Sequence, residues 1–295
     1  MIATEFRADL VAHIDAQLKG LDYSPKAAGD ARRKPAQYLM LLLRLLRRIP
    51  AARPRRVFQA PEFAVPPAHA VGYQTLARAV ESGTTLRPCL STLVRKLNER
   101  DDLLDDWGIH HFHLGNASHE KRADFVARTD EVAFAMVRAD AVYFLTATSH
   151  DPAAAPFVWT ETGLMDIVHR NWPALIATSR MPLNGQVLTA EKRAELRQCR
   201  VNASVTVSDG TVYYAPGGGM MSNGDGGTDY IYQMQLLRRL DHLEATIGQH
   251  EAQIRARLGV GKDAALALKA RFSISIPAGF AIEVYEPTSR TLIAT

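Results

Sequence analysis

The change of hydrophobic period at Trp107-Gly108 is the feature that most restricts what this chain folds into. Before this point, apolar residues recur at helical spacing, as they do from Phe6 to Leu18. After it, the segment 109–114 alternates in the manner of a half-buried strand. Two periods in separate blocks predict an α+β protein, and they exclude an all-helical chain or one continuous parallel sheet.

The first third of the chain is predicted to be helical. A second helix is expected to begin near Pro35, because proline is tolerated in a first turn, and to stop before Pro50. Two more helices are expected over 73–81 and 91–104, the latter with Ser91 as its N-cap. A proline-rich connection separates them from the second helix.

The centre is predicted to be an antiparallel meander. The strands expected after 109–114 are 131–137 and 141–148, and the short link Arg138-Ala139-Asp140 makes these two a hairpin. A helix follows, which Pro173 bends or divides.

The last third mixes helices and hairpins. Thr189 can cap a helix that runs to about Arg200, and Asp209-Gly210 is a strong hairpin turn. An amphipathic helix is expected over 236–258, before a closing hairpin. The expected regions are therefore 1–107, helical and basic, 108–180, the meander with its helix, and 181–295, α+β.

Bulk composition indicates an ordinary globular protein. The chain has 295 residues, of which 47% are hydrophobic and 22% charged, and its formal net charge is +4. The two cysteines lack C-x-x-C spacing, and Arg44 interrupts the longest apolar run. We therefore expect a soluble cytoplasmic protein without a disulfide framework or a membrane span.

Three histidines give the strongest chemical signal. In the strand 109–114, His111 and His113 are expected to share one face, because alternate strand residues point the same way, whereas His110 points to the other. His150 comes just after the second strand of the hairpin. In a small meander these imidazoles are expected to converge.

Such a group suits acid–base chemistry. Imidazole titrates near neutrality, so His113 and His150 would supply one general base and one general acid, in an order that the sequence does not assign. His111 would support or substitute for them. RNA cleavage by its own 2′-hydroxyl needs both roles and no metal. It also needs a cation for the phosphate, for which Arg122 is expected, with Lys121 and Arg128 as further candidates.

Two other interpretations of the histidines stay open. They fit hydrogen-bonded strand residues with a structural role, and they fit metal ligands of a hydrolase, since H-x-H spacing occurs in metal sites. No H-E-x-x-H or D-x-D motif accompanies them, so no metal or cofactor is assigned.

The stretch 111–150, HFHLGNASHEKRADFVARTDEVAFAMVRADAVYFLTATSH, resembles the core of RelE-like toxin endoribonucleases, especially the branch that uses histidines. The matching features are Leu114-Gly115, Arg122, the hairpin through Asp140 to Tyr143, and His150. The resemblance implies a metal-independent endoribonuclease that acts as a toxin or defence effector.

A basic stretch without acidic residues, 31–61, is the expected nucleic-acid contact. The arginines expected to bind RNA are Arg44, Arg47, Arg48, Arg53, Arg55 and Arg56. The alternatives are a solvated helix face, or the contact for an acidic protein partner such as an antitoxin. A non-enzymatic binding module that forms a homo-oligomer through the 236–258 helix is the competing class of function.

The glycine-dense loop 217–227 matches neither a P-loop nor a dinucleotide-binding motif. A flexible surface loop is the favoured interpretation, with a phosphate cradle or a substrate lid as alternatives.

Overall fold

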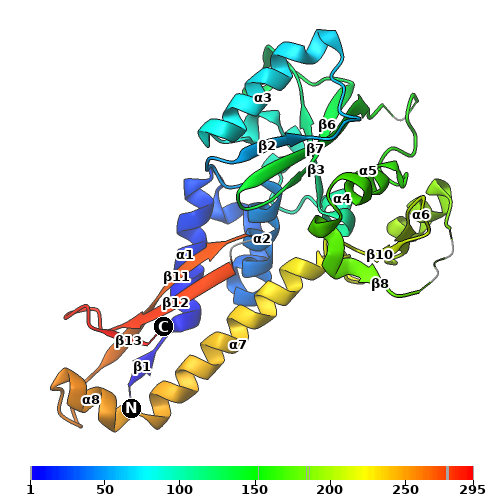
Figure 1. Cartoon of the computed structure of the whole chain (residues 1–295). Helices are drawn as coiled ribbons and strands as arrows, with labels where there is room; N and C mark the ends of the chain where they lie inside the picture. The colour runs from blue at the N-terminus through cyan, green and yellow to red at the C-terminus, as the bar shows by residue number, and fades with distance from the viewer. Residues whose placement is uncertain (1, 152, 184, 186, 277–278, 295) are drawn as a thin grey trace. The chain divides into compact units, whose positions relative to one another are not determined.

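The computed structural model describes residues 2–151, 153–183, 185, 187–276 and 279–294. It divides into two compact units, one formed by 1–46 with 229–295 and the other by 47–228 (Figure 1). This division differs from the three consecutive regions expected, because the two ends of the chain fold together. The α+β class is confirmed.

The unit formed by the two ends packs helices on a small sheet. Its sheet has the order β1-β11-β12-β13, with β1 parallel to β11 and the other pairs antiparallel. These strands are β1 Ala3–Thr4, β11 Ala267–Ser275, β12 Gly279–Tyr285 and β13 Leu292–Ala294. The predicted closing hairpin is therefore present.

Helix α1 (Phe6–Gly20) packs on β11 in this unit. It buries Phe6, Leu10, Ile14 and Leu18, spaced so that they share one face. The other helical elements of this unit, two of which extend a few residues beyond it, are the 3₁₀ helix Pro25–Arg33, α2 Pro35–Arg48, α7 Gly227–Gln249 and α8 Glu251–Leu258.

The predicted amphipathic helix is in fact α7 and α8, which meet at His250. In the apolar stripe of α7, Leu236, Leu240, Leu243 and Ile247 are all buried within the chain, whereas Ile254 and Leu258 of α8 are half-buried. The α7 part of the stripe is therefore covered in a single copy of the chain.

The 47–228 unit is built on a four-stranded sheet of order β2-β7-β6-β3. The strands are β2 Arg56–Gln59, β3 Ile109–His113, β6 Glu131–Val137 and β7 Ala141–Ser149. The meander β3-β6-β7 is antiparallel, as predicted, and β2 adds a parallel strand at its edge. The short strands β4 Ser118–His119 and β5 Arg122–Val126 form a separate pair.

A three-stranded sheet of order β8-β10-β9 completes the strands of this unit: β8 Arg180–Met181, β9 Ser204–Thr206 and β10 Val212–Tyr214. The β9-β10 hairpin confirms the Asp209-Gly210 turn. The helices are α3 Ala70–Ser82, α4 Asp102–Trp107, α5 Gly163–Asn171 and α6 Ala190–Gln198, with 3₁₀ turns at Pro67–His69, Arg87–Cys89, Thr92–Arg95 and Pro173–Ser179. Pro173 thus divides the helix that follows the meander, as predicted.

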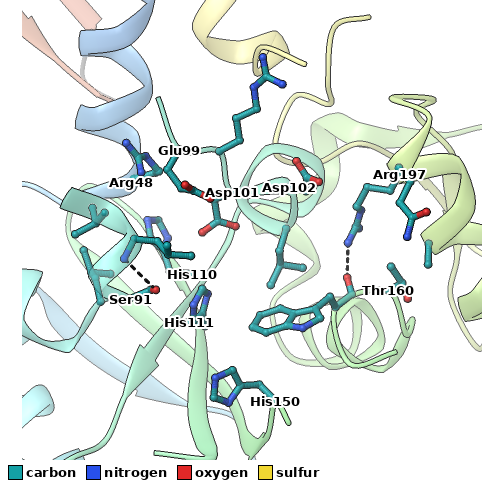
Figure 2. Close-up of a pocket in the computed structure, with 18 of the residues that line it drawn as sticks. Arg48, Ser91, Glu99, Asp101, Asp102, His110, His111, His150, Thr160 and Arg197 are labelled. Carbon is teal, nitrogen blue, oxygen red and sulfur yellow. Dashed lines mark hydrogen bonds between the residues drawn. The ribbon is translucent and has the colours of Figure 1, made fainter. Parts of the chain in front are cut away.

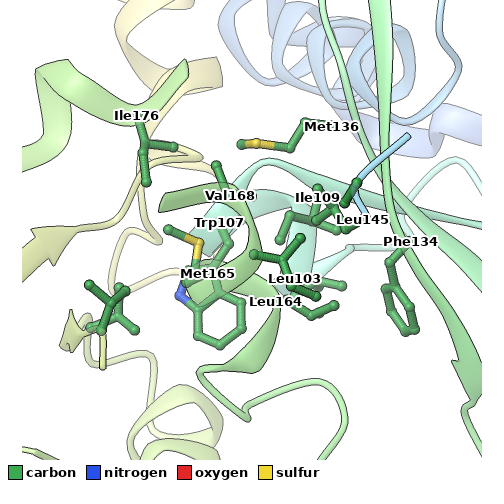
Figure 3. Packing of buried hydrophobic residues seen from close by; sticks show 14 of the residues in the cluster. Leu103, Trp107, Ile109, Phe134, Met136, Leu145, Leu164, Met165, Val168 and Ile176 are labelled. Atoms are coloured by element: carbon green, nitrogen blue, oxygen red, sulfur yellow. The ribbon is translucent and has the colours of Figure 1, made fainter. Parts of the chain in front are cut away.

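The core of this unit lies between the sheet and helices α4 and α5 (Figure 3). Trp107, at the end of α4, is fully buried beside Met165 and Val168 of α5. Gly108 follows with φ 73°, a left-handed conformation that glycine adopts without strain, and it turns the chain from α4 into β3. This turn is the physical basis of the change of period at Trp107-Gly108.

The helix predicted over 91–104 does not form. Ser91 caps only a 3₁₀ turn, by accepting a hydrogen bond from the Leu93 N–H, and Asp101 caps the new helix α4 by accepting from the Leu104 N–H. A side chain that captures a backbone N–H in this way starts a helix, so Asp101 sets the start of α4 at residue 102.

Candidate functional site

The histidines predicted from the sequence line one pocket of the 47–228 unit, of about 750 Å³ (Figure 2). It is bordered by the segment before α4, by β3, by the chain just after β7, and by α6. The residues that carry its chemistry are Asp101, His111, His113, Arg128, His150 and Trp159.

Strand register brings the histidines together. His113 of β3 pairs with Val132 of β6, which pairs with Thr148 of β7, so these three residues lie side by side across the sheet. His150 follows Thr148 by two residues along the chain. The rings of His113 and His150 have centroids 5.4 Å apart, and those of His111 and His113 are 6.3 Å apart. The convergence expected from alternation is therefore what the geometry shows.

Hydrogen bonds to the backbone fix where the proton of each key ring lies. The Thr129 N–H donates to Nδ1 of His113 at 3.3 Å, so the neutral ring of His113 carries its proton on Nε2. A carbonyl oxygen only accepts, so Nδ1 of His150 donates to the Asp130 oxygen at 2.6 Å, and its neutral ring has a lone pair on Nε2. One ring therefore offers an N–H and the other an acceptor.

Burial keeps the strand histidines neutral. Desolvation, together with smaller effects of the neighbouring His111, His150 and Arg128, lowers the pKa of His113 from 6.5 to about 3. Desolvation also lowers the pKa of His111, which Asp101 opposes. His113 is thus a neutral hydrogen-bond donor in the pocket.

His110 points to the other face of β3, as predicted, and its ring stacks on Phe112. Its Nε2 donates to the Arg47 oxygen at 3.1 Å, which leaves Nδ1 as an acceptor. Desolvation lowers the pKa of His110 to about 4. His110 nevertheless borders the same pocket. The alternation of side chains along the strand did not predict this position.

The predicted cation, Arg122, is not among the residues that line the pocket. It lies exposed on β5, whereas Arg128, the later candidate, lines the pocket close enough to His111 and His113 to lower the pKa of both. Arg128 makes no hydrogen bond or ion pair with any residue that the structure describes. It is therefore the arginine placed to meet an anion.

Sequence reasoning missed Asp101 and Trp159. Asp101 belongs to the acidic segment 99–106, in which no pattern distinguishes it from the other carboxylates, and it lies in the pocket beside the histidines (Figure 2). The indole of Trp159 lies edge-on to His111, with centroids 5.0 Å apart, and to His150, at 5.9 Å. Trp159 belongs to a segment without regular periodicity, so no sequence signal indicated it.

The basic stretch does not form the exposed patch that was expected. Arg44, Arg48 and Arg55 are each only 6% exposed. Arg47 is paired with Asp105 and donates to the Gly217 oxygen, and Arg55 donates to the Arg138 oxygen at 2.9 Å. Sequence clustering does not reveal burial, and Arg47 and Arg55 have partners within the protein. Arg48, although buried, also lines the pocket (Figure 2).

The remaining two arginines of the stretch differ from these. Arg53 is half-buried, whereas Arg56 is exposed and pairs with Asp140 at 2.5 Å. Only one of the predicted contacts is thus exposed, and it already has an acidic partner.

The glycine-dense loop is packed and its amides are used. The N–H groups of Gly217 and Gly219 donate to the oxygens of Asp106 and Asp105, and that of Gly227 donates to Gly219. A Cβ on Gly217 would lie 2.3 Å from the Leu104 oxygen. The loop lies against the end of α4 and does not present these amides to a phosphate.

Comparisons with protein-family models, with curated proteins and with solved structures find no match for the chain. Within the described ranges, no helix is both long and apolar enough to cross a membrane. In the same ranges, no group of three histidine, cysteine, aspartate or glutamate side chains has the arrangement of a metal site.

Proposed function

We propose that the protein is a metal-independent endoribonuclease of the cytoplasm, a toxin or defence effector, with its active site in this pocket. The observation that carries the proposal is the pair His113 and His150, whose backbone partners place an N–H on one ring and a lone pair on the other. Arg128 stands beside them without an anionic partner in the described part of the chain.

The proton positions support one order of the two roles. His150 takes the proton of the attacking 2′-hydroxyl on its free Nε2, while its Nδ1–H stays on the Asp130 oxygen. The 2′-oxygen then bonds to phosphorus, and the bond from phosphorus to the 5′-oxygen breaks, which leaves a 2′,3′-cyclic phosphate. The Nε2–H of His113 forms a hydrogen bond to the departing 5′-oxygen, which takes its proton from water, while His150 returns the proton that it accepted to water. Arg128 stabilises the charge on the phosphate.

The low pKa of His113 fits this order of events. Its ring is neutral because burial lowers its pKa to about 3. Since Nδ1 accepts the Thr129 N–H, the group that the ring offers to a substrate is the Nε2–H. The pocket, at about 750 Å³, has the size of sites that hold a small ligand.

The test is cleavage of total RNA by the purified chain in the presence of EDTA. The wild type is expected to leave 2′,3′-cyclic phosphate ends, and His150→Ala and His113→Ala are each expected to lose roughly 10²–10⁴-fold in rate. His242→Ala, on the exposed side of α7, is the matched control and keeps full activity.

Two results would remove the proposal. Loss of wild-type cleavage in EDTA would make the histidines metal ligands. Absence of cleavage of every RNA tested, with folded protein confirmed by circular dichroism, would make the pocket a binding site of a non-enzymatic module. The neutral state of His110, His111 and His113 is the observation that favours this second function.

A further inference from the structure

We infer that the end of the pocket at Asp101 binds a guanine base, and that the enzyme cuts RNA next to guanosine. This inference rests on the proposed function, since it names the substrate of the same pocket. Figure 2 shows Asp101 at one side of His111 and His150 at the other. Base binding and bond cleavage would therefore occupy adjacent parts of one pocket.

One carboxylate oxygen of Asp101 is available as a hydrogen-bond acceptor. Its Oδ1 accepts the Leu104 N–H at 3.0 Å, and neither carboxylate oxygen forms an ion pair with a described residue. A carboxylate has about four acceptor positions, so one cap leaves Oδ2 available. Because α4 requires this cap, the carboxylate is held at the pocket by the fold.

His110 supplies an independent sign of a ligand at this end. The residue is 7% exposed, lines the pocket, and has a buried Nδ1 without a hydrogen-bond partner in the described structure. Because Nε2 donates to the Arg47 oxygen, that Nδ1 is an acceptor. Asp101 also lines the pocket, and it is near enough to raise the pKa of His110 against the larger effect of burial.

An end that offers acceptors selects a ligand with donors. Guanine presents N1–H and the 2-amino group side by side, a pair that one carboxylate can accept. Uracil has a single N–H on this edge, and adenine and cytosine have a single amino group. Single-stranded bases are read on this edge and stacked on aromatic rings. Trp159, which also lines the pocket, offers such a ring.

The first experiment uses DNA oligonucleotides that contain one ribonucleotide, because only that position has the 2′-hydroxyl needed for cleavage. Initial rates are compared for guanosine, adenosine, cytidine and uridine at that position. Guanosine is expected to be cut roughly 10- to 100-fold faster, the discrimination of a good bidentate base contact. Inosine, which lacks the 2-amino group, is expected to be cut at a rate between that of guanosine and those of the other three nucleosides. 7-Deazaguanosine is expected to be cut at the same rate as guanosine.

Asp101→Asn is the decisive variant. Asparagine caps a helix as well as aspartate does, so α4 is retained while the carboxylate is lost. The preference for guanosine should disappear, so that the rate at guanosine falls to the level of the rates at the other three bases. Asp101→Ser, another good cap, repeats the test should the first variant misfold. Asp30→Asn, whose side chain is 92% exposed, is the control and keeps the preference.

The outcomes separate the two proposals. Equal cleavage at all four bases, or a preference that survives in Asp101→Asn, overturns the guanine site and leaves the ribonuclease standing. If the wild type cuts nothing, calorimetric binding of guanosine, adenosine, cytidine and uridine monophosphates decides the matter. A preference for the guanosine nucleotide that needs Asp101 supports the base site alone, and equal binding of all four overturns it.

Discussion

Acid is expected to destabilise the 47–228 unit because burial holds His110, His111 and His113 neutral. Burial lowers the pKa of His110 from 6.5 to about 4, and that of His113 from 6.5 to about 3. Between those values and 6.5 the unfolded chain binds more protons than the folded one. The stability is therefore complete above about pH 6.5 and is lost as the pH falls toward the folded values.

The magnitude follows from these pKa values. For one histidine with a pKa of 6.5 unfolded and 4 or lower when folded, the free energy of unfolding falls by about 1.2 kcal/mol between pH 7 and pH 5.5. His110 and His113 together give about 2.4 kcal/mol. His111 contributes in the same direction, because burial lowers its pKa as well.

The groups around each ring are consistent with a loss of stability in acid. His111, His150 and Arg128 face His113 and oppose its protonation, and the hydrogen bond from Thr129 is a smaller opposite influence. Asp101 favours protonation of His110, but burial outweighs it.

Urea denaturation at the two pH values measures the effect. All three tryptophans, Trp107, Trp159 and Trp172, lie in the 47–228 unit, so their fluorescence follows the unit that contains the pocket. His113→Asn keeps an acceptor for the Thr129 N–H but does not titrate. Its stability loss should be smaller than that of the wild type by about 1.2 kcal/mol.

The control for this experiment is His242→Asn, on the exposed side of α7, which should keep the wild-type loss. A loss in His113→Asn equal to that of the wild type would refute the reasoning, because burial of this ring would then not hold it neutral.

Three shorter predictions follow. Arg128→Gln should slow RNA cleavage about 100-fold, as loss of one charge-stabilising donor does, whereas Arg122→Gln, away from the pocket, should leave the rate unchanged. Asp106→Leu, which leaves the buried Arg197 without its partner at 2.6 Å, should lower the free energy of unfolding in urea by about 3–5 kcal/mol. Thr189→Ala removes the cap that accepts the Lys192 N–H and should cost about 1 kcal/mol in the same assay.

Elements set by local chemistry were predictable from the sequence. The turn at Gly108, the cap at Thr189 and the β9-β10 hairpin each depend on a few neighbouring residues, and each is confirmed. The strand β2 was missed because four residues in a proline-rich segment have too little pattern to show alternation. Its partner β7 lies more than 80 residues further along the chain.

The joining of the two chain ends was not predictable. Strand β1 has only two residues, and its pairing with Ala267 and Leu268 depends on contacts that no local pattern encodes. The burial of arginines in the basic stretch was not predictable for the same reason. An arginine in a sequence is expected at the surface, and only the fold shows that Arg47 lies against Asp105.

Part of the candidate site could be predicted from the sequence, but the exposure of its side chains to solvent could not. Alternation placed His111 and His113 together, but it carries no information on solvent. The structure adds that His113 is only 2% exposed and beside Arg128. Removal of water makes an unpaired imidazolium costly, so burial fixes His113 as a neutral hydrogen-bond donor. The same burial makes the unit sensitive to acid, because His113 binds a proton in the unfolded chain that it does not bind in the folded one. Sensitivity to acid and the N–H that the proposed ribonuclease would use therefore have one physical cause.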